Sequence, residues 1–178
     1  MNKFLILFLI SIVSCSNLRK LLDFNTFYTE LVNRHNTLRS KHGAQALTKL
    51  KALADLAQVT ANNCRDQQTL IHSSDYYNNQ PVGQNLYMSG GSAPTGTSVS
   101  NSWYSENVNY NYNTGKPKQT GQVIGHFTQL VWKNSKQIGC ALATGPWGSY
   151  DGYFVCCNYF PAGNYNNQYI ANVGKPTS

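Results

Sequence analysis

The sequence predicts an α+β fold in a single domain, with helices in the first half and a β-hairpin near the end of the chain. The chain has 178 residues, which is room for one domain of about 100–200 residues. Apolar positions recur every three to four residues in two early windows, and two strand-like runs lie close together late in the chain. Because helices and strands are segregated, the pattern does not favour an alternating βαβ architecture.

The composition indicates a folded globule. Hydrophobic residues make up 41% and charged residues 12%, with 12 Tyr, 7 Phe and 3 Trp, which excludes a charge-driven disordered chain. The net charge of +7 arises because acidic residues are scarce, 7 against 14 Lys and Arg. No run of five or six basic residues occurs, so we expect no nucleic-acid partner, whereas attraction to anionic surfaces is compatible with the charge.

Residues 1–16 are predicted to be a secretory signal peptide, because Lys3 precedes an apolar run and then small residues. The run is shorter than the roughly 20 residues that span a bilayer, and an uncleaved anchor is the alternative. Cleavage removes Cys15 and leaves a secreted, extracellular domain over residues 17–178 with no transmembrane segment. There disulfides persist, and an even number of cysteines fits two bridges. They are Cys64, Cys140, Cys156 and Cys157.

Three windows have helical periodicity. Residues 25–42 carry an apolar stripe, and Gly43 follows as a stop signal. Residues 49–64 place small alanines on their stripe, which indicates close packing. A third helix is predicted over residues 97–108, with Glu106 on its aromatic face.

The remaining elements are short. Residues 83–89 form a strand or an extended turn, and residues 125–132 a short helix. The runs 137–144 and 153–159 predict the two strands of the hairpin, with a Gly-Pro-Trp-Gly turn at residues 145–148.

Two polar stretches are predicted to be connections. Residues 65–81 are broken by Ser-Ser-Asp and Asn-Asn-Gln-Pro. Residues 107–114 alternate Asn and Tyr, and a tyrosine-rich loop accounts for this composition better than a nucleic-acid-binding or prion-like segment does.

The four histidines are the candidates for a site. His35 lies in the apolar stripe of the first helix and His42 near its exposed end, and a structural role is favoured for both. His72 and His126 each follow a break between elements, where a side chain can face a cleft. Two imidazoles and a carboxylate such as Glu106 would form a borderline metal site. The spacing alone does not connect these three residues.

Other chemistry has less support. The sequence contains no Gly-rich phosphate loop, no GxSxG elbow and no CxxC pair. A hydrolase of the usual nucleophile types is therefore not predicted. Glu106 is one of two glutamates, with Glu30, so its place on an aromatic helix face is not easily dismissed as generic surface charge.

Two motifs late in the chain resemble both signatures of the CAP superfamily, the cysteine-rich secretory, antigen 5 and pathogenesis-related 1 proteins (SCP domains). The resemblance extends upstream over nearly all of the chain after residue 16. The signatures are GHFTQLVWKNS at 125–135, followed by GCA at 139–141, and FVCCNYFPAGNY at 154–165; the upstream matches lie at 31–39, 47–48, 54–61, 72–73, 83–86 and 103–106.

The resemblance implies a three-layer α-β-α sandwich with a small antiparallel sheet between helices. It also implies a cleft with two His and two acidic residues that bind a divalent metal, and the matching positions here are His72, Glu106, His126 and Gln84. Many relatives have Glu where Gln84 stands. A neutral amide adds no negative charge, so we expect weaker metal binding, and without paired carboxylates acid/base catalysis is disfavoured.

The same resemblance implies one disulfide directly. Cys140 and Cys157 match a family pair that bridges neighbouring strands, which leaves Cys64 to reach Cys156. Because adjacent residues of a strand point to opposite faces, Cys156 and Cys157 should serve different partners.

The expected function is that of a secreted CAP-domain protein that acts by binding. The resemblance points to an extracellular lipid or sterol, or a protein partner, with Zn²⁺ or another divalent metal held weakly by His72 and His126. We expect no enzymatic activity. The alternative is a metal-assisted hydrolase that uses His126 and Glu106.

Overall fold

The computed structural model describes residues 24–177, so the predicted signal peptide lies outside the described residues. None of the helices in this range combines the length and the apolar character needed to cross a bilayer. In chain order the elements are a helix over residues 24–41, β1 (Thr48–Lys49), α2 (Lys51–Asp66), β2 (Tyr76–Tyr77), β3 (Gln80–Pro81), β4 (Gly83–Gly90), α3 (Gly96–Tyr104), a 3-10 helix η1 (Ser105–Asn109), β5 (Tyr110–Asn111), β6 (Lys116–Pro117), α4 (Gly125–Val131), β7 (Gln137–Trp147), β8 (Tyr150–Phe160) and α5 (Tyr169–Asn172).

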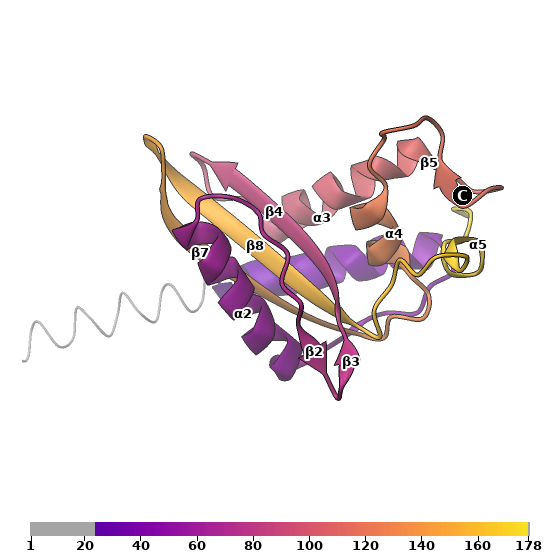
Figure 1. Ribbon diagram of the computed structural model, residues 1–178, viewed down its shortest axis with the longest axis horizontal. Helices are drawn as coiled ribbons and strands as arrows, with labels where there is room; N and C mark the ends of the chain where they lie inside the picture. The colour runs from indigo at the N-terminus through magenta and orange to yellow at the C-terminus, as the bar shows by residue number, and fades with distance from the viewer. Residues whose placement is uncertain (1–23, 178) are drawn as a thin grey trace, which may run out of the picture.

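The predicted α-β-α sandwich is confirmed (Figure 1). The central sheet has the order β1-β7-β8-β4, antiparallel except for the short β1–β7 pair. Alternate residues of β8 enter different cores, as a pleated strand requires. Val155, Cys157 and Tyr159 join the core shared with the first helix, α3 and α4, whereas Phe154 and Cys156 join the core under α2.

The second helix begins later than predicted because Thr48 and Lys49 pair with β7 in parallel. From Lys51 onward α2 lies directly on the sheet. A side chain at Gly139 of β7 would collide with the backbone of Leu53 and Ala54, so only glycine permits this approach. The alanine-rich stripe therefore packs closely, as the sequence predicts.

The hairpin is longer than predicted, and the expected turn at residues 145–148 is wrong. Gly145, Pro146 and Trp147 continue β7 and pair with the start of β8, so the connection is Gly148–Ser149. Beyond the short pairing with β1 this end of β7 is an edge, where a proline, which lacks an N–H donor, is tolerated.

Small hairpins lie within the first polar stretch and at the end of the second. β2 pairs with β3 inside residues 65–81, and β5 pairs with β6. Tyr110 is fully buried, so the Asn/Tyr stretch contributes to the core rather than forming only a surface loop. The third helix changes to 3-10 geometry at Ser105, earlier than the predicted end at 108.

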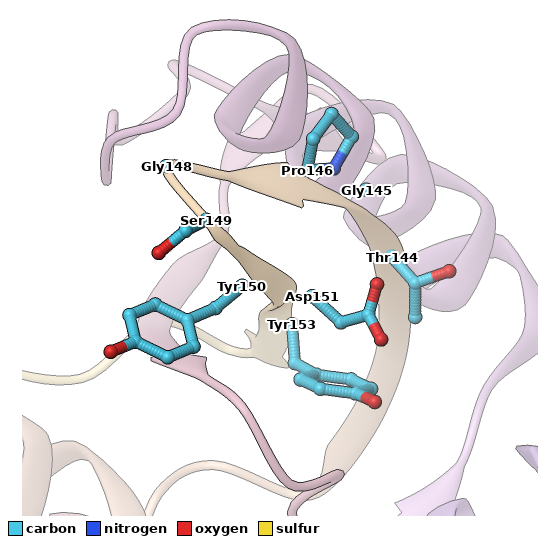
Figure 2. Close-up of a pocket in the computed structure, with 8 residues that line it drawn as sticks. All are labelled: Thr144, Gly145, Pro146, Gly148, Ser149, Tyr150, Asp151 and Tyr153. Atoms are coloured by element: carbon cyan, nitrogen blue, oxygen red, sulfur yellow. The ribbon is translucent and has the colours of Figure 1, made fainter.

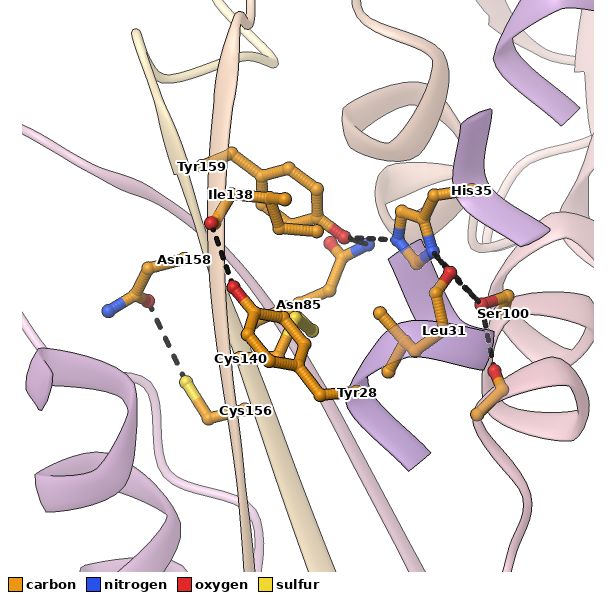
Figure 3. Close-up of a disulfide and its surroundings, with 12 residues drawn as sticks. Tyr28, Leu31, His35, Asn85, Ser100, Ile138, Cys140, Cys156, Asn158 and Tyr159 are labelled. Carbon is orange, nitrogen blue, oxygen red and sulfur yellow. Dashed lines mark hydrogen bonds between the residues drawn. A yellow bond between two sulfur atoms is a disulfide. The ribbon is translucent and has the colours of Figure 1, made fainter. Parts of the chain in front are cut away.

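Figure 3 shows the Cys140–Cys157 disulfide, which joins directly paired residues of β7 and β8. The predicted Cys64–Cys156 bridge is wrong, because both residues are buried free thiols. Cys156 does face α2, as strand alternation requires. Its thiol contacts Asn158 at 3.6 Å, whereas the Cys64 sulfur accepts a hydrogen bond from the Ile71 N–H at 3.3 Å.

Candidate functional site

His126 and Glu106 form the first half of the candidate site. The Nδ1 of His126 lies 2.6 Å from Oε1 of Glu106, and the imidazole stacks on Trp103 with ring centroids 6.4 Å apart. A carboxylate can only accept, so Nδ1 carries a proton, and in the neutral imidazole Nε2 keeps its lone pair. Oriented this way, His126 can bind a cation through Nε2.

Glu106 also caps the start of α4. Its Oε2 accepts hydrogen bonds from the backbone N–H groups of His126 and Phe127, at 2.9 and 3.1 Å. These are among the N–H groups that the first turn of a helix leaves without an intrahelical partner. The side chain is only 15% exposed. The Glu106 carboxylate thus caps the first turn of α4 and also fixes the orientation of the His126 imidazole.

His72 and Gln84 form the second half. The Nδ1 of His72 lies 2.9 Å from Oε1 of Gln84, and the same oxygen accepts from the Ser73 N–H at 3.2 Å. Gln84 Nε2 donates to Ser73 Oγ at 2.7 Å and to Asn158 Oδ1 at 3.1 Å. The amide that replaces the expected glutamate therefore still orients its histidine.

Strand β4 connects the two halves. Gln84 and Asn85 are consecutive, so their side chains leave opposite faces of the sheet edge. Asn85 Nδ2 donates to the carbonyl oxygen of His126 at 3.0 Å and to the Tyr159 hydroxyl at 3.3 Å. The structure thus places all four predicted site residues in two histidine pairs around one edge strand.

Each histidine pair offers one imidazole nitrogen as a cation ligand. In both pairs the partner oxygen accepts from Nδ1, which leaves each Nε2 available, as metal-binding histidines require. Within residues 24–177, however, no group of three or more His, Cys, Asp or Glu side chains is arranged to hold a metal ion. Two neutral ligands give a weak site.

His35 and His42 have structural roles, as predicted. His35 is fully buried between Leu31, Ser100 and Tyr159 (Figure 3). The expectation of an exposed position for His42 is wrong. Its side chain is buried, with Nδ1 donating to the carbonyl oxygen of Gly174 near the C-terminus and Nε2 accepting from the Tyr104 hydroxyl of α3.

The sequence did not reveal the polar network behind Gln84. Ser73, Asp75 and Asn158 are linked to it by hydrogen bonds. Ser73 and Asp75 belong to the polar stretch that was interpreted as a connection, and Asn158 lies 74 residues beyond Gln84. The one available signal was the position of Ser73 directly after His72.

Two concave regions lie away from the histidines. Figure 2 shows the first, about 660 Å³, at the tip of the β7–β8 hairpin, where Tyr150, Asp151 and Tyr153 project from β8. The second, about 700 Å³, lies between β6 and α5, and its lining combines apolar side chains such as Tyr169 and Ile170 with polar ones such as Lys116. None of the predicted site residues lines either region.

The fold and the paired histidines define the class of protein, and comparisons with known proteins agree. Residues 32–159 match the family described as "CAP: Cysteine-rich secretory protein family". Pathogenesis-related protein 1 of Arabidopsis thaliana is 39% identical over 78% of this chain and 79% of that protein. Human cysteine-rich secretory protein 2 is 40% identical over 78% of this chain but only 58% of its own length. The chain belongs to the CAP family.

Solved structures share the fold at low identity. Schistosoma mansoni venom allergen-like protein 4 is 23% identical, with a TM-score of 0.55 over 75% of this chain and 87% of that one. NaASP2, whose crystal structure was determined with Zn²⁺, is 24% identical, with a TM-score of 0.54 over 85% of this chain and 84% of that one. These similarities support the α-β-α architecture.

Proposed function

We propose that this protein is secreted and acts by binding the surface of a lipid assembly with anionic headgroups, rather than by catalysis. The hydrogen bonds and the residue types in the histidine cleft disfavour acid/base catalysis. Glu106 accepts three hydrogen bonds, and Gln84 is an amide that cannot exchange protons. In the alternative, a hydrolase, Glu106 would orient His126 as the general base, but position 84 supplies no second carboxylate to act as an acid.

The observation that carries the proposal is the distribution of charge at one end of the molecule, where α5, β5 and the C-terminus lie (Figure 1). Six of the described lysines are close to the C-terminal segment, and no acidic side chain lines the depressions there within the described chain. Four of these lysines line the depressions: Lys116, Lys118, Lys136 and Lys175. The backbones of Lys41 and Lys133 are hydrogen-bonded to Thr177 and Asn172.

Apolar side chains are exposed at the same end. Ile170 of α5 is 61% exposed and Val123, before α4, is 57% exposed. Together with Ile124 and Tyr169 they border or approach the groove beside Lys116. Lysines surrounding exposed aliphatic groups suit a membrane surface, since the charges contact headgroups while the apolar groups enter the acyl boundary.

A divalent cation such as Zn²⁺ is proposed as an optional, weakly bound component. His72 and His126 would hold it through Nε2. A bound cation would cross-link the two histidine pairs and add positive charge to the cleft. The zinc-containing structure of NaASP2 supports this assignment by similarity of fold.

Vesicle co-sedimentation tests the proposal. The protein should bind phosphatidylcholine vesicles containing about one fifth phosphatidylserine and not pure phosphatidylcholine, and added salt should weaken binding. Lys116→Glu/Lys118→Glu should reduce partitioning at least about tenfold, at roughly 1 kcal/mol per charge. Ile170→Ser should also reduce it.

Lys49→Glu/Lys51→Glu is the matched control, because it changes the charge equally on the exposed β1–α2 side. Equal loss in the control, or no binding to anionic vesicles, would refute the proposed surface. Hydrolysis of an ester or peptide panel that is abolished by His126→Ala would instead establish the hydrolase.

A further inference from the structure

Asp75 lies behind the His72–Gln84 pair and is connected to it through Ser73. Its Oδ2 accepts a hydrogen bond from Ser73 Oγ at 2.7 Å, with longer contacts to Thr60 Oγ1 at 3.3 Å and Asn158 Nδ2 at 3.4 Å. Asp75 is half-buried and enters no ion pair within the described residues. The shortest hydrogen bond of this carboxylate is therefore the one from Ser73, the residue that follows His72.

Two backbone groups fix the orientation of both side-chain amides in this network. The Ser73 N–H can only donate, so the Gln84 atom that faces it is Oε1 and the other is Nε2. The Leu53 carbonyl can only accept, so Asn158 directs Nδ2 toward it and Oδ1 toward Gln84. Both amide orientations follow from the backbone.

The hydroxyl of Ser73 accepts from Gln84 Nε2, so its one proton is available for another acceptor. Two lie within reach, Asp75 Oδ2 at 2.7 Å and Thr60 Oγ1 at 3.0 Å, and the carboxylate is the nearer. An acceptor-only carboxylate at this point prevents the hydroxyl from turning its proton toward Gln84. Ser73 thus holds the Gln84 amide at two points, with its N–H on Oε1 and its hydroxyl oxygen on Nε2. Asp75 secures the second point, so Oε1 stays directed at His72.

We propose that Asp75 is a positioning residue that acts through Ser73 and Gln84 to hold His72 with its proton on Nδ1 and its Nε2 lone pair free. Position 84 carries an amide, and the carboxylate of this hydrogen-bonded chain is instead that of Asp75, behind Ser73. The role of Asp75 in cation binding rests on the proposed function, whereas the tautomer of His72 can be measured in the metal-free protein.

Nitrogen NMR of histidine-labelled, metal-free protein at about pH 8 tests this directly, because the chemical shifts of Nδ1 and Nε2 report the ratio of the two neutral tautomers. The wild-type His72 should be predominantly the Nδ1–H form. Asp75→Asn and Ser73→Ala should each shift its tautomer ratio by about threefold to tenfold, as the loss of one hydrogen bond predicts. His126, which is oriented by Glu106, should not change.

Asp151→Asn is the control for charge, since Asp151 lies at the hairpin tip, and Asp75→Glu should restore the wild-type ratio in part. Ser73 is exposed, so Ser73→Ala is informative even if Asp75→Asn does not fold. A His72 tautomer ratio unchanged in the folded variants would overturn the proposal. Failure of the wild type to bind Zn²⁺ would refute only the metal assignment.

Discussion

His35 and Tyr159 are hydrogen-bonded in the centre of the protein, 124 residues apart in sequence, with Nε2 and the hydroxyl 2.8 Å apart. The Nδ1 of His35 faces the Leu31 carbonyl at 2.9 Å, so Nδ1 donates and Nε2 accepts from Tyr159. Both groups are fully buried. The core thus holds a neutral imidazole that is satisfied on both sides.

Stability should fall in acid because of His35. Burial lowers the pKa of His35 from 6.5 to about 3. As pH drops below 6.5 the unfolded chain takes up this proton and the folded protein does not, so stability is lost between pH 6.5 and about 3. From about pH 7 to pH 4 this amounts to roughly 3 kcal/mol. Urea unfolding at several pH values should show a smaller loss in His35→Gln, and equal slopes would contradict this account.

Arg39 should be intolerant of lysine. Its guanidinium is fully buried and donates to the carbonyl oxygens of four residues at 2.8–3.0 Å, and burial lowers its pKa to about 10. A lysine cannot reproduce this planar set of donors, so Arg39→Lys should cost about 3 kcal/mol. Arg34→Lys, whose guanidinium meets Asn101 at the surface, should cost less than about 0.5 kcal/mol. Similar urea midpoints for the two variants would contradict the prediction.

The four cysteines after residue 16 should form one disulfide and leave two free thiols. Peptide mapping of the protein without residues 1–16 should find Cys140 bonded to Cys157, whereas Cys64 and Cys156 should react with iodoacetamide after unfolding. In the native protein Cys156 should react slowly, because burial raises the pKa of its thiol. Replacing both bridged cysteines by alanine should cost about 3 kcal/mol. Recovery of a Cys64–Cys156 peptide would contradict this assignment of the two thiols.

Glu106→Gln should destabilise the protein although it is nearly isosteric. The amide loses the charge that favours the start of α4 and directs a donor at one of its three present partners, so we expect a loss of about 2 kcal/mol. Asp55→Asn is the control, since that carboxylate is 63% exposed and pairs only with Lys51, and should change stability by less than about 0.5 kcal/mol. Equal effects would show that Glu106 does not cap α4.

Zinc should bind weakly and depend on both candidate ligands. Calorimetric titration of metal-free protein with Zn²⁺ should lose its signal in His126→Ala and in His72→Ala, because one imidazole is too few. His42→Gln should bind zinc as the wild type does, since both ring nitrogens of His42 are already hydrogen-bonded. Unchanged affinity in His126→Ala would exclude the site.

Local patterns in the sequence determined the fold class and most elements. The helical stripe of residues 25–42, the alanine-rich second helix and the hairpin were predicted, because amphipathic periodicity depends only on neighbours along the chain. The resemblance to the CAP family then supplied the α-β-α layers, the Cys140–Cys157 bridge and the four candidate site residues. His72 and His126 were also singled out by their positions at breaks between elements.

Tertiary structure decided what those residues do. Only packing shows that Glu106 caps α4, that Gln84 is held by Ser73 and Asn158, and that Cys64 turns toward Ile71 instead of bonding to Cys156. The Thr48–Lys49 pairing and the extension of the hairpin through Pro146 are likewise contacts between distant segments. Hydrogen bonds between residues up to 124 positions apart leave no local signature, because their partners meet only when the sheet has formed.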